Sequence, residues 1–509
     1  MKRPASITAA GLLLAGSTFA IAAALGAGVA APERAMAQAG GCAALTAGGL
    51  FNKTTVTSAT PVAADAAKGL PAYCEVTAVI TPVKGSNIGV VYRLPEGWNG
   101  KMLGLGGGGW AGNVRIESAT EGLKAGYATA QTDGGHASTG PWETAWASNP
   151  EAVTDFSYRA IHLMTVIGKD VVARFYGKPQ SRAYYQGCST GGRQGLMEVQ
   201  RFPTDYDAEI TGAPVYNLLV QTSAVIRNNT FGAPGAGFTT DQLDLVNKAV
   251  LKACDAQDAL ADGVIADPRT CSWDPAAIQC KPGASGADCL SEGQVNALRT
   301  AYKGVQTIDG RQAAWPLARG GESGWSRFMQ ISGSTTDSSS GGGLGGLRGP
   351  ILGDPSFDLA KFNPDKDIAT VRSSKFAKGY EANDPAIGAY LGGGRKLLMW
   401  HGWSDPGPSP IGTIRYFDQV KGSVPAAGAN ARLFLAPGVY HCGGGPGPDK
   451  FDLLGALDRW VQTGKPPETL LATKLNSKVS RPLCPYPAAS HYKGVGDPDD
   501  AASFECKQP

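Results

Sequence analysis

The sequence has little charge, and it lacks the features of several protein classes. Only 17% of its 509 residues are charged, and the net charge is +3. Without the first 37 residues, which carry three basic residues against one acidic residue, the net charge falls to about +1. Nothing therefore points to binding of nucleic acid or of an anionic membrane surface. No stretch after the N-terminal region is long and apolar enough to span a bilayer. The spacing C-x-x-C is also absent, which disfavours zinc ribbons and thioredoxin-like redox motifs.

What is present indicates a large globular protein with many loops. The chain is too long for one compact core, so a main domain with a second domain or a large insertion is expected. Hydrophobic residues make up 42% of the sequence, and 70 glycines and 34 prolines predict frequent turns.

The N-terminus has the pattern of a secretory signal peptide. Lys2 and Arg3 precede an apolar stretch at 9–31, and Ala35–Ala37 fits an A-x-A cleavage site before Gln38. An uncleaved membrane anchor is disfavoured by the glycines in the apolar stretch. A lipoprotein is disfavoured because the residue three places before the first cysteine is alanine, not leucine. We therefore expect a secreted or periplasmic protein without a membrane anchor.

Ten cysteines, an even number, remain in the predicted mature chain. In an exported protein they predict disulfide bonds, but the sequence alone allows many pairings. The cysteines are Cys42, Cys74, Cys188, Cys254, Cys271, Cys280, Cys289, Cys442, Cys484 and Cys506.

Strand and helix signals alternate in two separate parts of the chain. This rhythm predicts a parallel sheet, and it stops between about 216 and 391, where strand signals are few. Strands are expected at 76–81, 88–94, 101–105, 127–132, 181–186, 206–214, 395–401 and 432–435, and helices at 156–176, 192–201, 241–254, 291–302, 411–419 and 451–462.

One turn between a predicted strand and a predicted helix carries a candidate nucleophile. The segment Gly187–Gly191 reads G-C-S-T-G, which matches the G-x-S-x-G elbow. Its glycines allow a sharp turn that raises Ser189 above the sheet edge and leaves the N–H of Thr190 at a helix N-terminus, where it can donate to an oxyanion. A glycine-rich turn with an incidental serine is the alternative interpretation.

A run of four glycines at 106–109 follows an earlier strand. Its place upstream of the elbow is that of the loop that supplies the second oxyanion donor in α/β-hydrolases. We name Gly108 as the donor, although the sequence does not distinguish it from its neighbours, and a flexible turn is the alternative.

A hydrolytic serine requires a base and an acid that orients the base, and α/β-hydrolases carry them in the order Ser, Asp, His. Asp405 and His441 each follow a later predicted strand in that order. His441 is preferred over the other four histidines by position, because they lie before the elbow, inside a helix, at a strand end or in the C-terminal tail. Asp405 alone could equally be a turn residue before a proline.

These motifs predict an α/β protein with the α/β-hydrolase fold and a large inserted lid domain. We expect a signal peptide at 1–37, the two parts of the core at 38–215 and 392–509, and the lid at 216–391.

Two cysteines flank the predicted catalytic pair directly. Cys188 precedes Ser189 and Cys442 follows His441, which suggests a disulfide beneath the nucleophile and the base. Further along, Asp255, Asp258 and Asp262 lie at spacings of four residues or fewer in one loop. Such an oxygen-rich loop suits Ca²⁺ although it lacks the EF-hand spacing, and a solvated acidic turn is the alternative.

Together these motifs resemble the tannase and feruloyl esterase family, which includes hydrolases of mono(2-hydroxyethyl) terephthalate. The resemblance covers about 42–506 and rests on the motifs GCSTGGR at 187–193, WHGWSD at 400–405 and YHCGG at 440–444. It implies a structural Ca²⁺ in the lid, held by the carboxylates of Asp255, Asp258 and Asp262 and by the carbonyls of Leu260 and Val264. It also implies four more disulfides, which pair Cys42 with Cys74, Cys254 with Cys271, Cys280 with Cys289, and Cys484 with Cys506.

The resemblance further implies a serine esterase that acts on small aromatic, phenolic esters. The first alternative is a terephthalate-monoester hydrolase, in which Arg348 of the lid could bind the free carboxylate. The second is a catalytically silent, calcium-stabilised surface binding protein, against which the three catalytic residue types in order argue. The acyl group, the alcohol and the oligomeric state do not follow from the sequence.

Overall fold

The structure is a computed structural model that describes residues 41–49, 51–138, 140–284, 286–328 and 344–508. The predicted signal peptide and most of the Ser/Gly-rich stretch at 332–349 lie outside the described residues. Within the described part, no helix is both apolar enough and long enough to cross a membrane.

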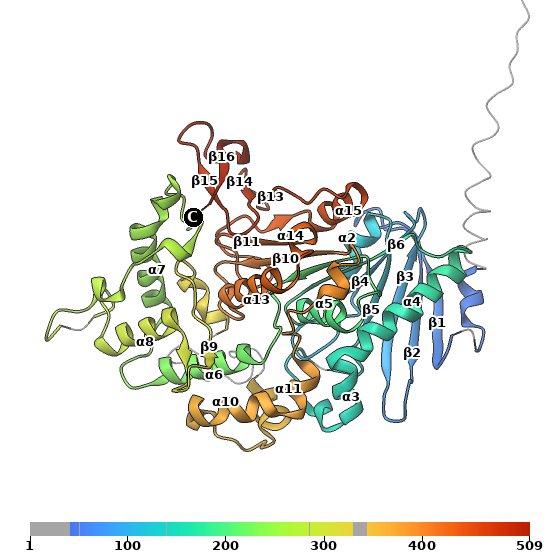
Figure 1. Ribbon diagram of the computed structural model, residues 1–509, viewed down its shortest axis with the longest axis horizontal. Coiled ribbons are helices and arrows are strands. Elements are labelled where there is room, and N and C mark those ends of the chain that lie inside the picture. The colour runs from blue at the N-terminus through green and yellow to red at the C-terminus, as the bar shows by residue number, and fades with distance from the viewer. Residues whose placement is uncertain (1–40, 50, 139, 285, 329–343, 509) are drawn as a thin grey trace, which may run out of the picture.

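A nine-stranded sheet forms the centre of the molecule (Figure 1). Its first three strands are antiparallel to their neighbours, and β5, β4, β6, β7, β10 and β11 run parallel. The predicted parallel sheet is therefore confirmed. In spatial order the strands are β1 (Thr54–Val62), β2 (Tyr73–Ile80), β3 (Ile88–Pro95), β5 (Ala128–Thr132), β4 (Lys101–Leu105), β6 (Arg182–Cys188), β7 (Ala208–Gly212), β10 (Lys396–Gly402) and β11 (Ala431–Ala436).

The strands form because their side chains alternate between two buried faces. In β4 and β6, Met102 and Tyr185 pack on one face, whereas Leu103 and Tyr184 pack on the other. The first face is covered by α4 (Ala160–Tyr176), α5 (Thr190–Arg201) and α13 (Pro410–Ser423), and the second by α2 (Ile116–Lys124) and α15 (Leu453–Thr463) (Figure 1). This is the layered arrangement of an α/β protein.

Helix α4 illustrates how local sequence sets these elements. Ile161, Met164, Val171 and Val172 are buried on its sheet-facing side, as their spacing predicts. The helix ends at Gly177, whose φ of +69° is the left-handed conformation that glycine adopts without strain.

The parallel strands end together at one edge of the sheet. Cys188 pairs with Gly212, Gly212 pairs with Trp400, and Gly402 pairs with Ala436. The segments after β6, β10 and β11 therefore begin beside one another, and these are the segments that hold the predicted catalytic residues.

The described part of the chain between β7 and β10 adds no strand to the large sheet, although β7 and β10 are neighbours. Its described part is mainly helical and lies beside and below the sheet in Figure 1, coloured from green to orange. Residues between 231 and 325 bury a separate apolar cluster around Trp325, whereas Ala382 and Leu391 pack on the sheet core. The bounds 216 and 391 of the lid stay predictions. The elements are α6 (Leu219–Gly232), α7 (Thr240–Cys254), α8 (Glu292–Lys303), β8 (Val305–Gln306), β9 (Gln312–Ala314), α9 (Leu344–Gly346), α10 (Pro364–Ser373), α11 (Lys375–Tyr380) and α12 (Gly388–Leu391).

The C-terminal tail adds short strands after the loop that carries His441. They are β12 (Lys450–Phe451), β13 (Leu470–Thr473), β14 (Ser480–Leu483), β15 (Ala489–Tyr492) and β16 (Phe504–Lys507). All ten cysteines are paired, and the five disulfides are those named from the sequence and the resemblance: Cys42–Cys74, Cys188–Cys442, Cys254–Cys271, Cys280–Cys289 and Cys484–Cys506.

Candidate active site

Ser189 lies at a strained turn between β6 and α5. Its φ is +63° and its ψ is −125°, a conformation that costs a non-glycine residue about 1–3 kcal/mol. The turn is so tight that a Cβ added to Gly187 would lie 2.5 Å from the backbone of Gly191. The buried Tyr185 hydroxyl donates to the Gly191 carbonyl at 2.8 Å and supports the first turn of α5. The turn at Gly187–Gly191 therefore has the geometry of a nucleophile elbow.

The buried Asp405 and the partly buried His441 form an acid–base pair beside this turn. The Nδ1 of His441 lies 2.6 Å from Oδ2 of Asp405, and the N–H of Gly407 donates to Oδ1 at 2.8 Å. Burial raises the pKa of Asp405, but the charge of His441 and hydrogen bonds from His401 and His441 outweigh it and bring the pKa to about 2. Asp405 is therefore ionised near neutral pH, and it holds the proton of His441 on Nδ1, which leaves Nε2 free to act as a base.

A second histidine binds the same carboxylate oxygen. The Nε2 of the fully buried His401 lies 3.1 Å from Oδ2 of Asp405, and its Nδ1 lies 2.8 Å from the Thr413 hydroxyl. Nε2 also faces the Pro408 carbonyl at 3.1 Å, so both of its partners are acceptors and Nε2 carries the proton. The sequence places His401 at a strand end, next to the loop that carries Asp405, and predicts no role for it.

Ser189 and His441 face one pocket with aromatic walls. The ring of Phe328 packs edge-on against His441 at 5.1 Å between centroids. Within the described residues, no hydrogen bond joins Ser189 to His441; such bonds are often long before substrate binds. The pocket is lined by Gly109, Trp110, Trp142, Ser189, Thr190, Val215, Val220, Gln221, Phe328, Tyr380, Pro408 and His441.

The glycine run lies directly against the elbow. The Thr190 hydroxyl donates to the Gly109 carbonyl at 2.6 Å. The N–H of Gly106 donates to Gln186 at 3.0 Å and that of Gly107 to the Gln194 side chain at 2.9 Å. These two N–H groups are occupied, so the N–H groups of Gly108 and Gly109 remain as candidate oxyanion donors. The assignment to Gly108 stays a prediction, and Gly109 is the glycine of the run that lines the pocket.

The Cys188–Cys442 disulfide joins the loops that carry the candidate residues Ser189 and His441. Its Cα atoms are 6.0 Å apart, and Cys442 has a φ of +60°. The bond therefore fixes the backbone immediately before Ser189 to the backbone immediately after His441.

Two buried arginines support the site, and neither was assigned from the sequence. Arg227 of α6 donates to the carbonyls of Pro406 and Gly407 at 3.1 and 3.2 Å, and so ties the lid segment to the acid loop. Arg193 of α5 donates to the Ser157 carbonyl at 2.7 Å and packs over the Tyr380 ring at 4.2 Å. In the sequence, Arg193 is marked by its place in the GCSTGGR motif. Arg227 is marked only as a lone arginine in a largely apolar helix.

Arg348, the residue named for the terephthalate alternative, is exposed and does not line the pocket. His136 is excluded as the catalytic base by chain order. Its Nε2 lies 2.8 Å from the Trp110 carbonyl, and burial lowers its pKa.

The predicted calcium loop is rich in oxygen atoms, but its three carboxylates do not converge on one point. Asp255 accepts the N–H groups of Asp262, Gly263 and Val264 at 3.3, 2.8 and 3.2 Å, and Asp262 pairs with Arg481 at 2.5 Å. Among the described residues, the three carboxylates do not form a group with all ligand atoms within 4.8 Å. An ion would have to draw them together.

The donor chemistry of this loop nevertheless fits Ca²⁺. Burial raises the pKa of Asp258 to about 6, and the charges of Asp262 and Asp255 contribute to the rise. A cation would relieve this repulsion. No N–H of the described residues donates to the carbonyls of Leu260 and Val264, so both are available as oxygen ligands.

Comparison with known proteins agrees with this geometry. A family model described as tannase and feruloyl esterase matches residues 74–507. The mono(2-hydroxyethyl) terephthalate hydrolase of Piscinibacter sakaiensis is 33% identical over 89% of this chain and 87% of its own length. Feruloyl esterase B of Aspergillus niger is 30% identical over 85% of this chain and 86% of its own length. The crystal structure of feruloyl esterase B from Aspergillus oryzae superposes with a TM-score of 0.84 at 26% identity, covering 92% of this chain and all of that one.

The strand order, the elbow and these matches over nearly the whole described chain all indicate the same family and fold. The chain belongs to the tannase and feruloyl esterase family and is a carboxylic ester hydrolase with the α/β-hydrolase fold.

Proposed function

We propose that this chain is a secreted serine esterase that hydrolyses esters of phenolic aromatic acids. Ser189 is the nucleophile, His441 the general base and Asp405 the residue that orients His441. The observation that carries this proposal is the hydrogen-bonded Asp405–His441 pair, which faces the same pocket as the strained Ser189. The predicted signal peptide and five disulfides support secretion, because disulfides persist in oxidising compartments.

In this mechanism the Ser189 hydroxyl attacks the ester carbonyl while Nε2 of His441 accepts its proton. The carbonyl oxygen becomes an oxyanion that the N–H groups of Thr190 and Gly108 stabilise. The C–O bond to the alcohol then breaks, and His441 returns the proton to the leaving alkoxide. Water, activated by His441, cleaves the acyl-enzyme in the reverse sense and releases the free acid and Ser189.

The pocket favours an aromatic acyl group with a polar substituent. Trp110, Trp142, Phe328 and Tyr380 offer flat apolar surfaces for a ring. Gln221 is only 3% exposed, and its side-chain oxygen has no hydrogen-bond partner. An unpaired buried acceptor is costly, and a phenolic hydroxyl would pair with it.

The terephthalate-monoester alternative has support from the identity to the Piscinibacter sakaiensis enzyme. Arg348 is exposed and does not line the described pocket, so it does not supply the carboxylate-binding group that this alternative needs there. Comparing kcat/KM on gallate, ferulate, chlorogenate and terephthalate esters decides between the two. Phenolic esters hydrolysed at least about tenfold better than terephthalate monoesters would support the proposal, and the reverse order would favour the alternative.

Gln221→Leu tests the acyl preference more sharply. We expect kcat/KM for methyl ferulate to fall about 10-fold or more, because a site built around a hydroxyl loses that contact. Methyl cinnamate, which lacks the hydroxyl, is the matched substrate and should lose little. Equal losses on both esters would reject a role for Gln221 in recognition.

Ser189→Ala tests the nucleophile. The variant should fold with an unchanged melting temperature, lose labelling by a fluorophosphonate probe and lose on the order of 10³ or more in kcat. The same probe separates the esterase from the silent binding protein, because only an activated serine reacts. Near-wild-type turnover would overturn the mechanism.

We further propose that the lid loop binds one structural Ca²⁺ through Asp255, Asp258 and Asp262 and the carbonyls of Leu260 and Val264. The ion would have no part in the ester chemistry. Its support is the available oxygen donors and the raised pKa of Asp258.

A further inference from the structure

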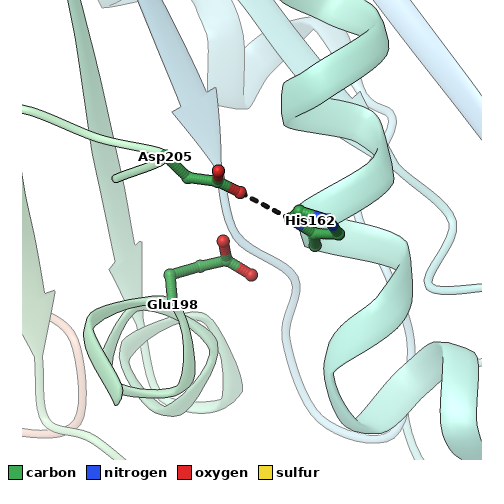
Figure 2. Close-up of side chains that lie close together, drawn as sticks. All are labelled: His162, Glu198 and Asp205. Atoms are coloured by element: carbon green, nitrogen blue, oxygen red, sulfur yellow. Dashed lines mark hydrogen bonds and ion pairs between the residues drawn. The ribbon is translucent and has the colours of Figure 1, made fainter. Parts of the chain in front are cut away.

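A second cluster of potential metal ligands lies away from the catalytic pocket, between α4 and α5. His162 comes from α4, Glu198 from α5, and Asp205 from the connection between α5 and β7. Figure 2 shows the Glu198 carboxylate directed toward both Asp205 and His162. One ligand atom from each residue lies within 4.8 Å of those from the other two, and the Nδ1 of His162 is 2.6 Å from Oδ2 of Asp205.

Glu198 is the unexplained member of this cluster. It is 0% exposed, and neither of its carboxylate oxygens has a hydrogen-bond donor. The nearby Lys169 ammonium donates to the backbone carbonyl of Asp205 at 2.5 Å. A buried carboxylate without a donor is strongly unfavourable, so something must compensate its charge.

Neighbouring carboxylates increase the need for a compensating positive charge at Glu198. Glu198 is fully buried, and the charges of the nearby Asp205 and Glu209 carboxylates oppose its own charge. Glu209 on β7 is itself 1% exposed with two unpaired oxygens. Three carboxylates thus share one buried region, with the Lys169 charge opposing them.

We propose that His162, Glu198 and Asp205 bind one divalent transition-metal ion, with Zn²⁺ as the ion that best suits the set. One imidazole and two carboxylates are typical zinc ligands, whereas Ca²⁺ and Mg²⁺ prefer oxygen alone. Zinc bonds of about 2.0–2.1 Å place tetrahedral ligand atoms roughly 3.3 Å apart, so the 2.6 Å contact between His162 and Asp205 would open slightly. The His162 side chain is 28% exposed, which gives an ion and a water ligand access from the surface.

The role of this ion would be structural. Glu198 is nine residues after Ser189, about 13 Å along α5, so the ion would not reach the ester. It would join α4 to α5, the helix that begins at the nucleophile, and to the entry of β7. The competing explanation is a proton shared between Glu198 and Asp205.

Zinc titration of the full mature protein, without an affinity tag and after removal of bound metals by a chelator, tests the proposal. Calorimetry should give one equivalent of bound Zn²⁺, with a rise in melting temperature and release of protons as the ligands deprotonate. Glu198→Gln and His162→Gln should each weaken binding at least about tenfold and abolish the thermal shift. Glu198→Gln is isosteric, and His162→Gln alters a partly exposed side chain, so the second variant decides if the first does not fold.

Two controls separate this site from others. Asp255→Asn, in the proposed calcium loop, and His441→Asn, in the catalytic pocket, should both retain the zinc equivalent. No zinc binding to the wild-type protein, or binding unchanged in His162→Gln and Glu198→Gln, would overturn the proposal and leave a shared proton as the compensating charge.

Discussion

At the scale of single residues, Asp405 holds the site together because it accepts a hydrogen bond from two histidines at one oxygen. The fully buried His401 contacts the same carboxylate oxygen as His441 and so helps to hold the carboxylate in place. We therefore assign His401 as a positioning residue that acts through Asp405.

His401→Leu should lower kcat by about tenfold, because Asp405 gains freedom and the imidazole of His441 loses its alignment. KM should change little, because the loss falls on the alignment of the base and not on substrate binding. His401→Asn, whose amide can still donate, should restore part of the rate. A loss that His401→Asn does not restore, or an equal change in KM, would indicate a role in packing alone.

Asp405 also predicts a pH dependence of stability. Its folded pKa of about 2 lies below the ordinary 3.8, so the folded state favours the ionised form. The resulting stabilisation is present above about pH 4 and is lost as the pH falls toward 2, with a size of about 2 kcal/mol. Denaturant unfolding of the wild type and of Asp405→Asn between pH 2 and 5 measures it. The difference between the two should shrink as the pH falls, and a constant difference would contradict the prediction.

At the scale of elements, the elbow, the acid loop and the base loop could be predicted because each follows a strand of the same parallel sheet. The pattern at 181–186 and 395–401 predicted β6 and β10 to within two residues. The common strand edge then brings Ser189 and His441 to one pocket, with the buried Asp405 hydrogen-bonded to His441. The second donor to Asp405 could not be predicted in this way. His401 belongs to the buried end of β10, and strand periodicity does not say which buried histidine contacts a carboxylate.

The Cys188–Cys442 disulfide is the element that fixes these loops relative to each other. Its sequence separation of 254 allows roughly 5 kcal/mol of stabilisation in the chain-entropy model, an upper figure. Replacing both cysteines by alanine should lower kcat by around 10²-fold, since a shift of about 1 Å can cost that much, and should change KM less.

The matched control for that change is the Cys280–Cys289 pair, which spans 9 residues in the lid segment. Its double alanine variant should keep kcat. Non-reducing peptide mapping of the wild type should recover a peptide that joins Cys188 to Cys442. A free thiol at either position, or equal kinetic losses in the two double variants, would reject the tether.

At the scale of the whole molecule, the segment between β7 and β10 was predicted as an insertion because strand signals stop there. Its packing could not be predicted. Irregular segments give no periodicity, so the buried cluster around Trp325 and the contact of Arg227 with the acid loop emerge only in three dimensions. The edge strand β1 was also missed, because its alternating pattern is mostly exposed.

Calcium removal tests whether an ion stabilises this segment. EGTA should lower the melting temperature and Ca²⁺ should restore it, because an ion bound only by the folded state stabilises by mass action. Asp258→Asn should show a smaller response than the wild type. Activity should fall through disorder of the lid and return with Ca²⁺. Protein that contains no calcium by elemental analysis and does not respond to EGTA would leave the loop as an acidic turn.

The long separation of Cys188 and Cys442 also has a consequence for biosynthesis. The cysteines at 254, 271, 280 and 289 lie between them, and these pair over only 17 and 9 residues. If the chain is exported from its N-terminus, as proposed, both short bridges can close before Cys442 has emerged, whereas Cys188 must wait for almost the whole protein. In the proposed mechanism, the nucleophile and its base would then be joined covalently only in a nearly complete chain, after the two short bridges between them have closed.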